Sequence, residues 1–184
     1  MPLLFAGLAL FILIHLIPVA VPLRNRLAGA FGEARYKMAF ALFSALAVGL
    51  IIYGKSVAEF VPLYEPPGWG RHGAWLMMLV AFVLLASTQG PSALRHYLKH
   101  PMLLAVAVWG GGHLLANGDL ASIVLFGTMA GFGVLMIFLL LLRDRAGSRV
   151  AYSWRSTIVQ SLVGAAIYLV IMYAHPFLFG VAVV

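Results

Sequence analysis

Residues 100–120, HPMLLAVAVWGGGHLLANGDL, decide the class of fold because they place a histidine inside an apolar helix. Counting 1.5 Å of rise per residue from Pro101, His113 lies about 18 Å along that helix, within a hydrocarbon layer about 30 Å thick. An imidazole at that depth needs a partner. The glycines Gly110, Gly111 and Gly112 remove side chains from the preceding turn, so a neighbouring helix or a flat cofactor can approach the backbone. The sequence Asn117-Gly118-Asp119 predicts the end of the helix.

The whole chain shares this apolar character. Of its 184 residues, 64% are hydrophobic and 9% are charged, and the mean hydropathy is +1.04. This composition predicts an all-α, polytopic bundle of membrane helices. The chain has no cysteine, which excludes disulfides, thiolate metal sites, iron–sulfur clusters and cysteine nucleophiles. No linker or internal repeat divides the sequence, so we expect one transmembrane domain over residues 1–184.

Hydropathy predicts six membrane-spanning helices, separated by short connectors. The predicted spans are residues 2–22, 38–54, 74–90, 101–116, 120–142 and 156–174. In the fifth span Gly127 and Gly131 have the spacing of a close helix contact. Several prolines between residues 55 and 73 prevent a regular helix there, so this stretch is expected to be an interfacial loop. The last span is predicted to end at His175-Pro176.

Basic residues are concentrated in alternate connectors. Ten of the twelve lie in the first, third and fifth connectors: Arg24, Arg26, Arg35, Lys37, Arg95, Lys99, Arg143, Arg145, Arg149 and Arg155. Only Lys55 and Arg71 lie on the other side. The positive-inside tendency therefore predicts that these connectors are cytoplasmic and that both termini are outside. Attraction to anionic lipid then explains the positive charge, and no nucleic-acid partner is expected.

Two histidines are predicted to lie within membrane spans. His15 is about 12 Å and His113 about 18 Å from the cytoplasmic ends of their helices, so their heights differ by about 6 Å. A tilted porphyrin between two imidazoles can absorb that difference. Alternatively, each imidazole only forms a hydrogen bond to a serine, a threonine or a backbone carbonyl of another helix. The spacing does not decide between these two interpretations.

The other four histidines are expected to be solvated or interfacial. His96 and His100 are four residues apart and would share one face of a helix, but no third metal ligand is evident. His72 falls in the outer loop and His175 at the end of the last span.

Two long stretches resemble the NnrU family, whose domain is shared with plant and cyanobacterial cis-zeta-carotene isomerase. They are RNRLAGAFGEARYKMAFALFSALAVGL, after the helix that carries His15, and KHPMLLAVAVWGGGHLLANGDLASIVLFG. The resemblance implies haem b held non-covalently by His15 and His113. It also leaves the activity open, because the family includes a haem-dependent isomerase and is associated with nitric oxide reductase in denitrifying bacteria.

From this resemblance we expect a redox-responsive haem site linked to nitric oxide metabolism, in a bacterial inner membrane. Trp109 and the face of Gly110, Gly111 and Gly112 would form part of the haem pocket. The propionates would pair with Arg24, Arg26 or Arg95. The main alternative is cis-carotene isomerisation at the same haem.

Other classes of protein stay open beside these. Lys99-His100-Pro101 resembles the RHP signature of small membrane methyltransferases, although no carboxylate follows Asp144 where those enzymes use an acidic pair. A non-enzymatic assembly factor, contacting a haem-enzyme complex through Gly127 and Gly131, is the third possibility.

Overall fold

The computed structural model describes residues 1–143 and 151–183, so Asp144, Arg145 and Arg149 of the fifth connector lie outside the described residues. Within these ranges the regular structure is helical apart from an isolated antiparallel bridge between Pro62 and Asp119. The helices are α1 (Pro2–Leu16), α2 (Val21–Phe31), α3 (Glu33–Ser56), α4 (Gly70–Ala86), the 3-10 turn η1 (Ser87–Gln89), α5 (Ala93–Leu98), α6 (Pro101–Ala116), α7 (Leu120–Arg143) and α8 (Trp154–Phe179). The all-α fold is confirmed.

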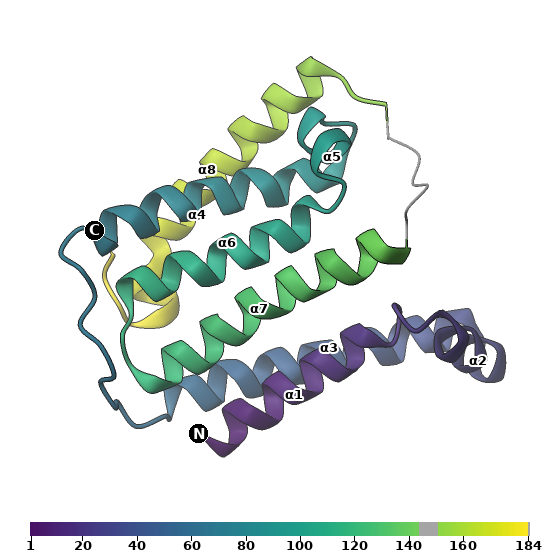
Figure 1. The fold of residues 1–184 in the computed structure, drawn as a ribbon, viewed down its shortest axis with the longest axis horizontal. Helices are drawn as coiled ribbons and strands as arrows, with labels where there is room; N and C mark the ends of the chain where they lie inside the picture. Colours follow the sequence, from purple (N-terminus) through teal and green to yellow (C-terminus); the bar gives the residue numbers. More distant parts are fainter. Residues whose placement is uncertain (144–150, 184) are drawn as a thin grey trace.

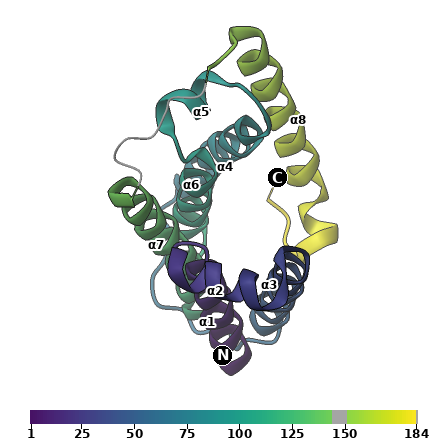
Figure 2. The ribbon, with the colours of Figure 1, turned by 90° about the vertical axis from the view of Figure 1, so that its right-hand side faces the viewer.

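The six long helices pack side by side in the order α8, α4, α6, α7, α1, α3. Figure 2 shows that this row is curved, with α3 and α8 at its two ends. Large apolar side chains such as Leu13, Leu42, Val134 and Leu162 are exposed on its outer surfaces. A soluble protein rarely exposes so much apolar surface, whereas in a multi-pass membrane protein this surface faces the lipid bilayer.

The length of the helices supports fewer spans than the hydropathy pattern predicts. In the described ranges, α3, α4 with η1, α7 and α8 are long and apolar enough to cross a membrane, and the bent pair of α1 and α2 would make a fifth span. Helix α6 begins and ends as predicted, but it has only 16 residues. The count of six is therefore not confirmed.

The first predicted span, residues 2–22, is not one straight helix. Helix α1 ends at Leu16, and α2 continues at an angle of 89° to it. Pro18 lies in the break and Pro22 in the first turn of α2, where its missing N–H costs no hydrogen bond. His15 consequently lies at the very end of α1 instead of in the middle of a span.

The last helix is longer than predicted, because α8 continues through His175 and Pro176 to Phe179. It ends at Gly180, whose φ of +72° is a left-handed conformation that favours glycine, and the Gly180 N–H donates to the Pro176 carbonyl at 2.9 Å. A proline so close to the end removes little from the helix.

Glycines lie where the helices pack most closely. A Cβ atom on Gly110 would be 2.6 Å from the Phe126 carbonyl oxygen of α7, and one on Gly112 would be 2.9 Å from the Met77 Cβ of α4. By contrast, a Cβ on Gly127 or Gly131 would meet no atom within 4 Å. The predicted close contact through Gly127 and Gly131 is therefore not made within the described chain.

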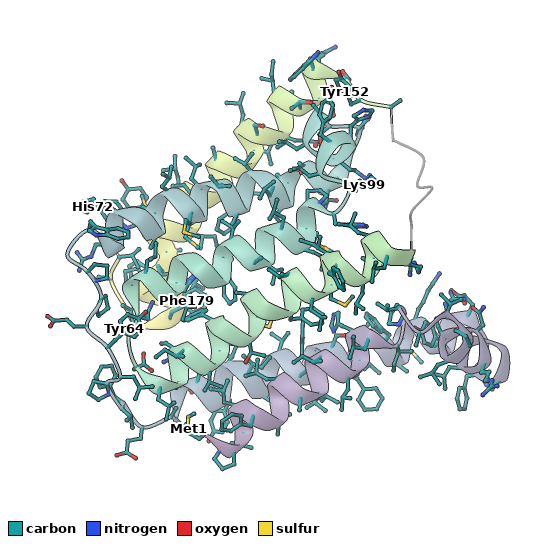
Figure 3. The ribbon with its side chains drawn as sticks, in the orientation of Figure 1. Met1, Tyr64, His72, Lys99, Tyr152 and Phe179 are labelled. Atoms are coloured by element: carbon teal, nitrogen blue, oxygen red, sulfur yellow. The ribbon has the colours of Figure 1, made fainter. Side chains whose placement is uncertain are left out.

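The two ends of the bundle differ in charge. One end, which we call the basic rim, consists of α2, α5, the first turns of α3 and α8 and the last turn of α7. Figure 3 shows Lys99 and Tyr152 there, and Met1, Tyr64, His72 and Phe179 at the opposite end, the N-terminal rim. Seven of the eight described members of the set of ten basic residues lie in these elements, and the eighth, Lys99, directly follows α5 at the same rim.

Candidate cofactor site

His15 is held at the basic rim by its own helix and by aromatic rings. Its Nδ1 is 2.8 Å from the Phe11 carbonyl oxygen, and because a carbonyl only accepts, Nδ1 carries the proton. Its ring stacks on Phe11 with centroids 4.0 Å apart and meets Phe40 of α3 at 5.2 Å and Phe132 of α7 at 6.1 Å. The lone pair of His15 is therefore on Nε2, the atom available to a metal.

His113 has the same local arrangement on α6. Its Nδ1 donates to the Trp109 carbonyl at 2.9 Å, which again leaves the lone pair on Nε2. Its ring stacks on Phe126 of α7, with centroids 4.3 Å apart and planes at 21°, and Trp109 flanks it at 4.9 Å. Both histidines thus satisfy one ring nitrogen within their own helix, so neither needs the hydrogen bond to another helix that the sequence left open.

The two histidines lie at different levels of the bundle. His15 meets α7 at Phe132 and His113 meets it at Phe126, six residues earlier, which corresponds to about 9 Å along the helix. This difference is larger than the value of about 6 Å expected for an unbroken first helix over residues 2–22, and α1 ends at Leu16. His15 and His113 therefore do not lie at the same level along α7.

A pocket of about 350 Å³ opens at the basic rim beside His15. Its size falls in the range of small-molecule sites, roughly 300–1,000 Å³. The lining combines apolar side chains of α6 and α7 with cationic groups of α5 and the following turn. The lining residues are His15, Pro18, Thr88, Arg95, Lys99, His100, Pro101, Met102, Leu103, Phe132, Met136 and Leu140. This pocket therefore has the chemistry to hold an apolar molecule that carries an anionic group, and His113 does not line it.

Of the three arginines expected at the haem propionates, only Arg95 lines this pocket. Its guanidinium Nη1 donates to the Thr88 carbonyl at 3.4 Å. Arg24 instead donates to the Glu33 carboxylate at 2.5 Å, where it ties α2 to α3, and Arg26 is exposed on α2. Only Arg95 is thus placed for the predicted role.

Trp109 and the three glycines contribute to helix packing. Trp109 packs on Phe126 with centroids 5.1 Å apart, and Gly110 and Gly112 are buried against α7 and α4. The Cα atoms of Gly110 and Gly112 are therefore in close contact with these helices. A contribution of these residues to a haem pocket stays a prediction.

The N-terminal rim contains contacts that support His113 and that sequence reasoning missed. The Asn117 side chain donates from Nδ2 to the His113 carbonyl at 2.8 Å, which caps α6. The Tyr64 hydroxyl donates to the Leu114 and Asn117 carbonyls, and the Leu63 N–H donates to the Gly118 carbonyl at 2.9 Å. The loop between α3 and α4 is therefore fastened to the end of α6.

Asp119 connects the same corner to α3. Its carboxylate accepts hydrogen bonds from Lys55 Nζ at 2.8 Å and from the Ser122 N–H at 3.0 Å. Asp119 thus caps the start of α7 and pairs with the last turn of α3. An acidic residue directly before an apolar span was the sequence signal for the cap, but its cationic partner is 64 residues away in the chain.

The remaining histidines do not form a metal cluster in the described residues. Helix α5 ends at Leu98, so His96 and His100 do not share a helical face as their spacing suggested. His96 packs on Tyr97 and Tyr152, with centroids 4.7 Å apart in both cases. Across residues 1–143 and 151–183, no three His, Cys, Asp or Glu side chains are grouped to hold a metal ion.

The fold defines a multi-pass α-helical membrane protein. Two of its histidines each donate a hydrogen bond to a carbonyl of their own helix, and a pocket at one rim is lined by both apolar and cationic side chains. Residues 3–183 match the family described as NnrU protein, and the chain belongs to that family. Searches of curated proteins and of solved structures gave no match. Family membership is therefore established over nearly the whole chain.

Proposed function

We propose that this NnrU family protein binds haem b non-covalently and uses it as a redox-responsive site linked to nitric oxide metabolism. The iron would be held by His15, which lines the pocket, and by a second histidine, for which the family resemblance implies His113. The observation that carries the proposal is the hydrogen bond from each Nδ1 to the carbonyl four residues earlier. Metal-bound histidines characteristically donate their second ring N–H to a carbonyl or carboxylate, which fixes the tautomer and the ring orientation.

The residues around His15 suit an amphiphilic ring. Phe132, Met136 and Leu140 offer an apolar wall that excludes water, and Arg95 and Lys99 offer positive charge where carboxylates would emerge. The stack on Phe11 restricts rotation of the imidazole. When bound, haem would supply an iron that changes by one electron, and this iron would bind a small gas once one histidine ligand detaches. The chain's own contribution is to hold the ligand and to tune its surroundings.

The test of haem binding is the absorption spectrum of the purified protein. We expect a Soret band in the wild type, and loss of that band or a change of spin state in His15→Ala. His72→Ala, which changes a histidine at the opposite rim, serves as the control and should leave the spectrum unchanged. Unchanged spectra in both His15→Ala and His113→Ala would contradict the proposal.

The role in nitrogen-oxide chemistry is tested separately. The reduced protein is mixed with nitric oxide and, in a second experiment, with cis-zeta-carotene, while the haem spectrum and the carotenoid isomers are followed. A nitrosyl spectrum without isomer conversion supports the proposal. Conversion that depends on the reductant would establish the isomerase alternative instead.

We also propose an inner-membrane location in bacteria with both termini outside. The support is the concentration of basic residues at one rim, because such residues favour the cytoplasmic side. The haem pocket would then open toward the cytoplasmic leaflet.

A further inference from the structure

The geometry points to His100, and not His113, as the second axial ligand beside His15 for the haem proposed above, on which this inference rests. His15 and His100 line the same pocket, whereas His113 lies outside it. The pairing was not evident from sequence, because His100 falls in a basic turn and the two residues are 85 positions apart.

The levels of the residues along α7 support this pairing. His15 meets α7 at Phe132, and a Cβ on the neighbouring Gly133 would be 2.7 Å from the Leu103 carbonyl oxygen of α6. His100 precedes Leu103 by three residues, about 4.5 Å of helix. Helices α6 and α7 run antiparallel, so the levels of His15 and His100 differ by about four residues, or about 6 Å, while His113 meets α7 about 9 Å from Phe132, at Phe126.

The backbone between α5 and α6 places His100 and Lys99 together in the lining. Helix α5 ends at Leu98, and Lys99 has a φ of +58°, which is rare for a residue with a side chain. His100 is the N-cap of α6, and Pro101 begins the helix. Lys99 and His100 both line the pocket directly after this change of backbone direction.

The charge of the pocket matches a ligand with carboxylates. Arg95 and Lys99 are cationic, the start of α6 adds its positive dipole end, and no acidic side chain lines this pocket in the described residues. The lining also includes the apolar side chains of Phe132, Met136 and Leu140 from α7. Two imidazoles, an apolar wall and a cationic edge are the parts that a six-coordinate haem b requires.

The experiment compares the spin state of the haem in matched variants, by absorption and electron paramagnetic resonance of the oxidised protein. We expect a low-spin signal in the wild type and conversion to high spin in His100→Ala and in the polar variant His100→Gln. His113→Ala and His96→Ala should keep the low-spin signal. His96 is the matched control, because it lies on α5 near the same rim but outside the pocket.

Rescue separates ligand loss from misfolding. In His100→Gly, added imidazole should restore the low-spin signal by filling the vacated position, and the same addition should not alter the wild type. Low-spin haem in both His100→Ala and His100→Gln, together with high-spin haem in His113→Ala, would overturn this assignment and leave haem binding intact. A wild-type protein that takes up no haem would instead overturn the proposed function.

Discussion

At the scale of single residues, Asp119 combines a helix cap with an ion pair. It is only 5% exposed, caps α7 and pairs with Lys55 of α3. Burial by itself raises the pKa of Asp119, but the hydrogen bonds from Lys55 and Ser122 outweigh burial and lower the pKa below its ordinary value of 3.8. The charged form of Asp119 therefore stabilises the folded state.

We expect Asp119→Asn to lower the free energy of unfolding in detergent by about 1–3 kcal/mol at neutral pH, because Lys55 loses its charged partner. Since the pKa is lower in the folded state, this stabilisation is complete above the unfolded pKa of about 3.9. It is lost as the pH falls through the folded pKa, so the difference between wild type and variant should shrink below about pH 4. Thermal unfolding at several pH values measures the difference.

Glu59→Gln is the control for Asp119→Asn, since Glu59 is an exposed carboxylate in the loop between α3 and α4. This control should leave the unfolding temperature unchanged at every pH. A difference between wild type and Asp119→Asn that grows on acidification would contradict the role given to the carboxylate.

At the scale of helices, the close contacts of α6 with both of its neighbours depend on missing side chains. Gly110 allows the approach to α7 and Gly112 the approach to α4. Without an aqueous phase between helices, packing of this kind is the main source of association within a membrane. These contacts keep α6 in the middle of the row and set the level of both His100 and His113.

We expect Gly110→Ala to destabilise the protein by about 1–3 kcal/mol, because the new Cβ would overlap backbone of α7 and force the helices apart. Gly127→Ala is the matched control on α7. No atom lies within 4 Å of its added Cβ, so it should be neutral or slightly stabilising. Thermal unfolding of both variants in the same detergent provides the comparison. Equal effects would show that the contact between α6 and α7 is not tight.

At the scale of the whole molecule, the charge is divided between the two rims. The basic rim holds most of the cations, whereas at the N-terminal rim Lys55 is paired with Asp119 at 2.8 Å. The first turns of α3 contain one acidic residue, Glu33, which is paired with Arg24 and Lys37. We expect this asymmetry to favour a single orientation in the membrane.

We expect a C-terminal alkaline phosphatase fusion to be active and a C-terminal green fluorescent protein fusion to be dark, because both reporters would be outside. A truncated fusion after Gly32, at the basic rim, should give the opposite result. A fluorescent C-terminal fusion together with an inactive phosphatase would reverse the proposed orientation.

The sequence alone was sufficient for the class of protein, the family and the boundaries of α6. These depend on local properties: a run of apolar residues, a proline that begins a helix, and Asn117-Gly118-Asp119 that ends it. Sequence also identified His15 and His113 as histidines within apolar helices, although their use as ligands stays a prediction.

Only the tertiary structure decided which residues meet. It ended α1 at Leu16, covered Gly110 with α7, left Gly127 and Gly131 without a close contact, and placed His15 in a pocket with His100. Such relations depend on the register of helices that are far apart in sequence, and a shift of one residue along a helix moves a side chain by about 1.5 Å and turns it by about 100°. Hydropathy is nearly the same on every face of these helices, so the hydropathy pattern carries little information on the register. The packing of glycines and aromatic rings determines the register instead.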